Sequence, residues 1–84
     1  MTDIEFELLD QLYFVQTIDS LCNDLNMSNS EIVIELKRLF DKEWIKILDS
    51  DSETEITDPA LWGKDLTNFY YLITKKGLFA HNTL

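Results

Sequence analysis

Several residue types are scarce in this chain of 84 residues, and each shortage excludes a class of protein. The sequence has one cysteine, one proline and two glycines. A single cysteine cannot form a disulfide within the chain, so a disulfide-stabilised scaffold is excluded. The shortage of proline and glycine, together with a hydrophobic content of 45%, argues against a disordered or low-complexity protein. We therefore expect residues 1–84 to form one compact globular domain.

Positive charge is also scarce. Seven lysines and arginines face sixteen aspartates and glutamates, which gives a formal net charge of −9. A field of this sign repels phosphate backbones and anionic lipid at long range. Because the Debye length at cellular salt is about 8 Å, a local group of cations could still act against that mean. The overall charge thus disfavours DNA as a partner, and the positions of the cations matter more than their number.

Long hydrophobic runs are missing as well. The longest uncharged apolar stretches, such as FYYLI, are far shorter than the roughly 20 residues that a membrane-spanning helix needs. No basic and apolar leader opens the chain. We expect a cytoplasmic protein that has no membrane partner.

The residues that commonly carry catalysis are few. The only histidine, His81, falls in the expected C-terminal tail, and the only cysteine, Cys22, falls on the inward face of an expected helix. No Ser-His-Asp, metal-ligand or glycine-rich phosphate pattern is present. The stretch DSDSE, residues 49–53, alternates oxygen ligands but lacks the glycine and the distal glutamate of a calcium loop. We expect no enzyme activity, no cofactor and no metal.

The first expected helix covers about residues 3–14. Thr2 and Glu5 form a capping box at its start. Its apolar stripe has spacings of four, four and three residues: Ile4, Leu8, Leu12 and Val15. Three more apolar residues, Phe6, Leu9 and Tyr13, lie on the flank of this stripe. The helix therefore has room for a second burial surface, such as a dimer contact.

Two further helices are expected before residue 43. Thr17 caps a short one that ends near Asn26, a residue that tolerates the left-handed conformation. Ser28 and Glu31 form a second capping box, and the helix that they open ends near Lys42. The periodicity of 3.6 residues assigns these side chains to the inward faces: Ile18, Leu21, Cys22 and Leu25, then Ile32, Leu36, Leu39 and Phe40.

The second half of the chain is expected to form a β-hairpin and a last short helix. WIKIL, residues 44–48, and TNFYYLI, residues 67–73, are rich in aliphatic and aromatic residues and predict paired strands. Between them lies a long acidic loop, about residues 49–66, whose length excludes a tight turn. Thr74 is the expected cap of the last helix, and the tail after His81 is expected to fray.

Two details of this hairpin region follow from the same pattern. Side chains alternate between the faces of a strand, so one of Tyr70 and Tyr71 should be buried and the other partly exposed. In the loop, Trp62 either packs on the domain as an anchor or faces a partner. All charged residues in the first half of the loop are acidic, and the one cation of the whole loop, Lys64, lies in its second half. Such a loop would repel a nearby duplex.

The order helix, helix, turn, helix, strand, loop, strand resembles the winged helix-turn-helix family. The stretch TIDSLCNDLNMSNSEIVIELKRLFDKEWI, residues 17–45, resembles the helix-turn-helix of small bacterial transcription regulators. Cys22 stands where that family needs a small residue, and Asn26 where it usually has glycine. FYYLITKKGL, residues 69–78, resembles the second wing strand and the start of the closing helix.

This resemblance implies an α+β winged-helix fold. It would consist of a three-helix helix-turn-helix core, a two-stranded β-hairpin wing and a short C-terminal helix. The resemblance also implies a homodimer that contacts DNA through its third helix. One departure is Glu43, which stands where relatives mostly carry glycine after that helix. A left-handed conformation of this residue would cost on the order of 1 kcal/mol, so we expect the turn to be built differently.

The candidate site is the outward face of the third helix. The inward positions leave Ser30, Ile34, Lys37, Arg38 and Asp41 facing outward, and Ile34 is nearest the centre. Direct readout of a major groove relies mainly on Arg, Lys, Asn and Gln. Because the central residue is aliphatic, the sequence does not decide whether this face binds DNA or a protein.

Three interpretations of the face remain. In the first, six residues contact DNA, and Lys42 and Lys46 add phosphate contacts: Ser28, Asn29, Ser30, Ile34, Lys37 and Arg38. In the second, the face binds a protein partner around Ile34, and DNA is not bound. In the third, it is a solvated surface with one ordinary exposed aliphatic residue.

Overall fold

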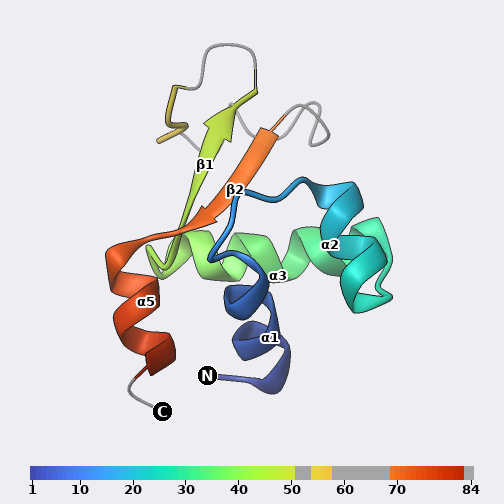
Figure 1. Cartoon of the computed structure of the whole chain (residues 1–84), viewed down its shortest axis with the longest axis horizontal. Coiled ribbons are helices and arrows are strands. Elements are labelled where there is room, and N and C mark those ends of the chain that lie inside the picture. Colours follow the sequence, from blue (N-terminus) through green and yellow to red (C-terminus); the bar gives the residue numbers. More distant parts are fainter. Residues whose placement is uncertain (51–53, 58–68, 83–84) are drawn as a thin grey trace.

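The computed structural model describes residues 1–50, 54–57 and 69–82 (Figure 1). The elements are α1 (Asp3–Gln11), α2 (Ile18–Leu25), α3 (Asn29–Asp41), β1 (Ile45–Asp49), β2 (Phe69–Ile73) and α5 (Lys75–Asn82). The described residues thus form an α+β fold with four helices and a two-stranded antiparallel sheet. In Figure 1 the two strands project to one side of the helices. Three predictions fall outside the described residues: most of the acidic loop including Trp62 and Lys64, strand residues 67–68, and the end of the tail.

The capping signals in the sequence act where they were expected. The Thr2 hydroxyl accepts a hydrogen bond from the Glu5 N–H at 3.1 Å, and the Glu5 carboxylate accepts one from the Thr2 N–H at 3.0 Å. Ser28 and Glu31 form the same box at the start of α3. Thr17 caps α2 with its side chain. These bonds satisfy N–H groups that a helix start leaves without a partner, so local sequence sets where the helices begin.

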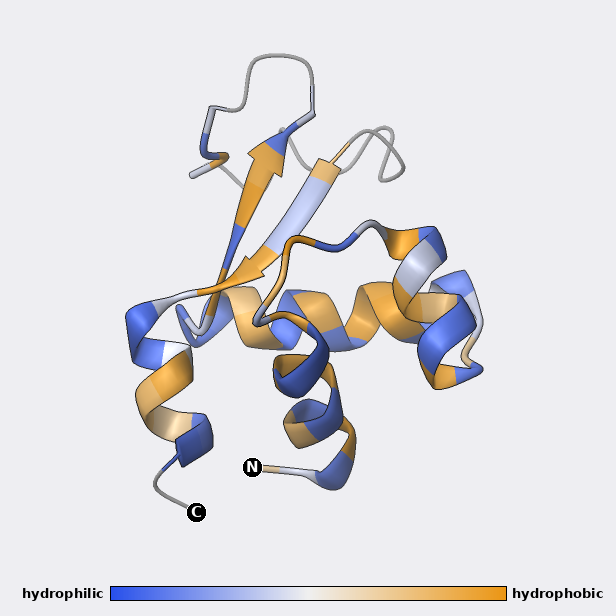
Figure 2. Cartoon of the chain, viewed as in Figure 1, coloured by the Kyte–Doolittle hydropathy of each residue, from blue (hydrophilic) through white to orange (hydrophobic). Residues whose placement is uncertain are grey.

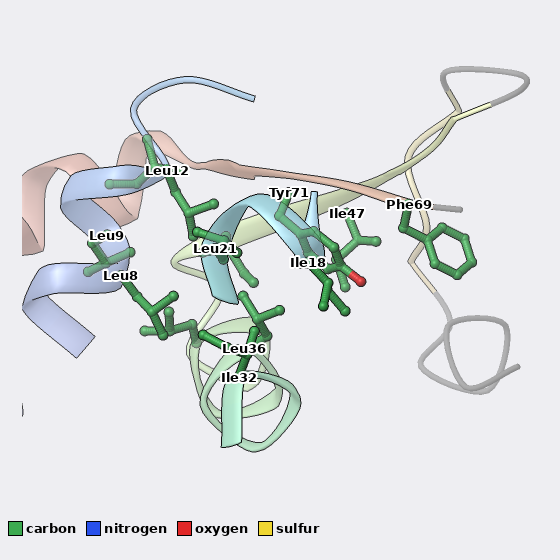
Figure 3. Close-up of a cluster of buried hydrophobic side chains, with 13 residues drawn as sticks. Leu8, Leu9, Leu12, Ile18, Leu21, Ile32, Leu36, Ile47, Phe69 and Tyr71 are labelled. Atoms are coloured by element: carbon green, nitrogen blue, oxygen red, sulfur yellow. The ribbon is translucent and has the colours of Figure 1, made fainter. Parts of the chain in front are cut away.

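The hydrophobic core lies between the first three helices and one face of the hairpin (Figure 3). Its buried side chains are Leu8, Leu9, Leu12, Ile18, Leu21, Ile32, Leu36, Leu39, Ile45, Ile47, Phe69, Tyr71 and Ile73. In Figure 2 the helices alternate hydrophilic and hydrophobic residues, whereas β1 is mostly hydrophobic.

The expected stripe of α1 is wrong at both ends. Ile4 and Val15 are 36% and 51% exposed, whereas Leu9 is fully buried. The helix ends at Gln11 rather than near residue 14, so the helical period no longer places Val15 toward the core. The buried side of α1 is instead centred on Leu8, Leu9 and Leu12.

The two strands pair as the sequence predicted. The register runs from Ile45 opposite Ile73 to Asp49 opposite Phe69. Tyr71 is fully buried and Tyr70 is half-buried, which confirms the expected alternation. Each strand also makes backbone hydrogen bonds on its outer edge, to a segment outside the hairpin pair.

These edge partners were not predicted. Gln16, between α1 and α2, exchanges two backbone hydrogen bonds of 3.0 and 2.9 Å with Tyr71 of β2. On the other side, the Ile56 N–H donates to the carbonyl of Ile47 in β1 at 2.7 Å. The pairing of Gln16 ties the connection between the first two helices to the sheet. Both edges of the hairpin are therefore partly covered, which limits edge-to-edge association.

Among the described residues, two that are not glycine adopt positive φ. Asn26 has a φ of 54° at the end of α2, as expected for the turn of a helix-turn-helix. Glu43 has a φ of 63°, so the turn after α3 is left-handed despite the missing glycine, and our expectation of a different turn is wrong. Bonds to α5 and its cap hold Glu43 in place: the Thr74 hydroxyl donates to its carbonyl at 2.7 Å, and Lys76 pairs with its carboxylate at 3.2 Å.

Helix α5 corrects the expectation that His81 lies in the C-terminal tail. This histidine is only 8% exposed and belongs to the helix, which Thr74 caps as predicted. Its ring stacks on Phe6 at a centroid distance of 4.1 Å, and its Nδ1 lies 2.7 Å from the Tyr13 hydroxyl. The flank of α1 that the sequence left open for a second burial surface is therefore covered in part by α5 of the same chain, and Phe6 and Tyr13 remain 40% and 38% exposed.

Gly77 allows this helix to approach the end of α3. A Cβ at this position would lie 2.1 Å from the carbonyl oxygen of Trp44, which is a backbone atom. We predict that Gly77→Ala lowers the free energy of unfolding by about 2 kcal/mol, because α5 would have to move away from the sheet. Urea unfolding followed by tryptophan fluorescence measures this. The control is Lys75→Ala at an exposed position of α5; equal stability of the two variants would contradict the close approach.

Candidate contact surface of helix α3

The outward face of α3 is positioned by its buried side. Ile32, Leu36 and Leu39 are fully buried, and Ile34 on the opposite side is 53% exposed. The prediction that Ile34 faces solvent is confirmed. The other five candidate residues, Ser28, Asn29, Ser30, Lys37 and Arg38, are also exposed. All six lie on α3 or at its N-cap, so they share one helix.

The N-terminal end of this surface is already occupied by groups of the chain itself. Ser28 donates from its hydroxyl to the Glu31 carboxylate at 3.0 Å and accepts from the Glu31 N–H at 3.3 Å. The side-chain oxygen of Asn29 accepts a hydrogen bond from the Cys22 thiol at 3.0 Å. The Glu31 carboxylate also places negative charge where a DNA phosphate would approach a helix start. This end of α3 is therefore poorly prepared for phosphate.

Two cations of the surface have carboxylate partners within the chain. Arg38 lies 3.2 Å from the carboxylate oxygen of Glu35 on the same helix. The Lys42 ammonium lies 2.6 Å from the Glu5 carboxylate of α1 and 4.7 Å from the centre of the Trp44 ring. Two of the four cations that could have formed a phosphate-binding group thus have acidic partners within the chain.

The bond between Glu5 and Lys42 is the less exposed of these two pairs. The Glu5 side chain is only 3% exposed. Burial raises the pKa of Glu5, but the hydrogen bonds from Lys42 and Thr2 and the charge of Lys42 outweigh it, and the pKa of this carboxyl lies below its ordinary value. Glu5 is therefore ionised at neutral pH. It caps α1 and fixes the end of α3 against α1 at the same time.

This linkage gives a pH dependence of stability. A lowered pKa in the folded state stabilises the fold above the ordinary carboxyl value of 4.5, and this contribution is lost as the pH falls through the folded-state pKa. We predict that Glu5→Gln lowers the free energy of unfolding at pH 7 by about 1–2 kcal/mol, because a buried charge-assisted bond is lost. Urea unfolding of both proteins at neutral and acidic pH measures the difference, which should shrink at acidic pH. A difference that stays constant would contradict the role of Glu5.

Cys22 and His81, the residues considered for catalysis, lie in α2 and α5. Burial raises the pKa of the Cys22 thiol, and the negative charge of Asp19 raises it further, so the thiolate is disfavoured at neutral pH. His81 packs between α1 and α5 as described above. Within residues 1–50, 54–57 and 69–82, no three His, Cys, Asp or Glu side chains are grouped to hold a metal ion. No helix in that part of the chain has the length and apolar run that crossing a bilayer requires.

Comparison with known protein families, curated proteins and solved structures found no match to this chain. Sequence reasoning found the exposed face of α3 but missed that Glu5 and Glu35 hold two of its cations. Spacing of three residues is a signal for the pair on α3, whereas Glu5 and Lys42 are 37 positions apart and carry no local signal.

Proposed function

We propose that this chain is a winged-helix domain of the transcription-regulator type whose α3 face docks a protein partner. The observation that carries the proposal is that Ile34, at the centre of the face, is exposed while carboxylates of the chain itself bind two nearby cations. Arg38 and Lys42 have carboxylate partners at 3.2 and 2.6 Å, and Ile34 is 53% exposed between them and the helix start.

The winged-helix part of the proposal is supported by topology. Three helices precede an antiparallel hairpin, and α5 follows it. Gln16 lies in the connection between α1 and α2, and its backbone bridge to Tyr71 adds a short strand-like contact between this connection and the sheet. The left-handed Asn26 forms the corner between α2 and α3. This arrangement positions α3 with one side on the core and the other on the surface, as a helix that recognises a partner requires.

The docking part is supported by the chemistry of the face. An aliphatic side chain gains free energy when a partner removes it from water, and roughly 25 cal/mol per Å² of apolar surface is the usual yield. Charged groups that are already paired need less rearrangement when the surface is covered. The net charge of −9 also favours a partner with basic groups over a nucleic acid.

DNA binding through the same helix is the second candidate. It is favoured by the exposed Lys37 and Arg38, which lie on adjacent positions of the outward face together with Ser30. In that case Ser28, Asn29 and Ser30 would lie near the phosphates, and Ile34 would contact a thymine methyl group. A homodimer, as the family resemblance implies, would fit either candidate.

A photo-crosslinking residue at position 34 tests the proposal. With benzoylphenylalanine in place of Ile34 in growing cells, we predict a discrete protein adduct, because the side chain would lie inside the interface. The control carries the same residue in place of the exposed Asn23 on α2, where no adduct is expected. Adducts to DNA alone, or equal protein adducts from both positions, would contradict the proposal. Light scattering of the purified chain then distinguishes a second copy from a different protein.

A further inference from the structure

A groove of about 470 Å³ lies at the C-terminal end of α3, beside β1 and residues 54–57. Its apolar wall is formed by Phe40, Ile45 and Ile56, which come from α3, β1 and the segment that pairs with β1. Three acidic residues, Asp41, Glu43 and Glu55, also line it. Its volume falls within the roughly 300–1,000 Å³ that is usual for ligand sites.

The charges of this groove favour a cation. Among the described residues of the lining, Lys46 is basic and three are acidic. Glu43 is already paired with Lys76 at 3.2 Å, whereas Asp41 and Glu55 are exposed and make no ion pair within the described part of the chain. A ligand that combines an apolar stem with a positive end would match both the wall and these two carboxylates.

The groove continues the outward face of α3. Asp41 follows Ile34 by seven residues, so the two side chains project to the same side of the helix. Two helical turns separate them, a distance of about 10 Å along the axis. A protein that covers Ile34 can therefore also contact the groove, because both lie on the same side of α3.

We propose that the groove takes one arginine side chain of the protein partner. The hydrocarbon stem lies on the wall formed by Phe40, Ile45 and Ile56, and the guanidinium faces Asp41 and Glu55. Arginine fits better than lysine because its planar group can serve two carboxylates and stack on an aromatic ring. The inference rests on the proposed docking function. It specifies the partner: an apolar residue over Ile34 and an arginine about 10 Å away.

Titration of the whole chain with Nα-acetyl-arginine amide tests the site itself. Proton–nitrogen correlation spectra report on the backbone amides, and we expect saturable shifts that centre on Lys46, Glu55 and Ile56. Nα-acetyl-citrulline amide has nearly the same shape without the charge and should not produce them. Equal shifts with both compounds, or arginine shifts spread over the acidic surface without saturation, would overturn the proposal.

Two double variants with the same change in net charge sharpen the test. Asp41→Asn with Glu55→Gln should weaken the binding of acetyl-arginine amide at least about threefold, since exposed pairs each contribute up to about 1 kcal/mol. Asp19→Asn with Asp24→Asn, on exposed positions of α2, should leave it unchanged. Equal weakening by both would show that only the general charge matters, and would overturn the site.

The outcomes separate this inference from the docking function. If acetyl-arginine amide fails to bind while position 34 gives a protein adduct, the groove proposal fails alone. If it binds while position 34 gives none, the arginine site stands and its assignment to a docked partner fails. Ile34→Ser should leave the binding of acetyl-arginine amide unchanged, because Ile34 does not line the groove.

Discussion

Burial of Ile32, Leu36 and Leu39 is the constraint on which the contact surface of this protein depends. Each of these fully buried side chains contributes roughly 1.5–3 kcal/mol, so rotation of α3 about its axis would be costly. The helix therefore has one orientation, and Ile34 must face solvent. The hairpin forms one side of the core against which α3 packs. Its strands pair with each other, and Gln16 pairs with β2. What the surface can bind is then decided by the groups beside Ile34.

Those groups are less basic than their sequence suggests. Arg38 is held by Glu35, and Lys42 is drawn toward α1 by a carboxylate that is almost completely buried. Both bonds lower the local positive potential that a phosphate backbone would need. The groove at the end of α3 adds carboxylates to the same side of the molecule. Together these features favour a partner that brings its own apolar and basic groups.

Local features of the fold could be predicted from the sequence. The two capping boxes and the left-handed Asn26 depend on residues close in the chain, and the strand pairing follows from alternating aliphatic and aromatic residues. Exposure of Ile34 followed from helical periodicity alone. A few neighbouring residues determine each cap, the turn at Asn26 and the exposure of Ile34, whereas the strand pairing joins two segments that the sequence marked separately.

Features that depend on distant residues were missed or wrong. The expected stripe of α1 placed Ile4 and Val15 inside, and for Val15 the reason is that the helix stops at Gln11, which the sequence does not show. His81 was assigned to a frayed tail, but stacking on Phe6 and the bond to Tyr13 hold it against α1. Glu43 adopts the left-handed conformation at a helix end closed by local backbone bonds to Phe40 and Leu39, and Thr74 and Lys76 add bonds from α5 and its cap. No local pattern indicates these long-range bonds, since each joins segments more than 30 residues apart.

The most direct test of the account is the salt dependence of duplex binding by the unmodified chain. Fluorescence anisotropy with a random-sequence DNA duplex, measured from low to moderate salt, reports whether free cations meet phosphates. We predict no measurable affinity even at the lowest salt, because Arg38 and Lys42 have carboxylate partners and the net charge is −9. Affinity that falls steeply and linearly on logarithmic axes as salt rises would contradict it and make α3 a DNA-binding helix.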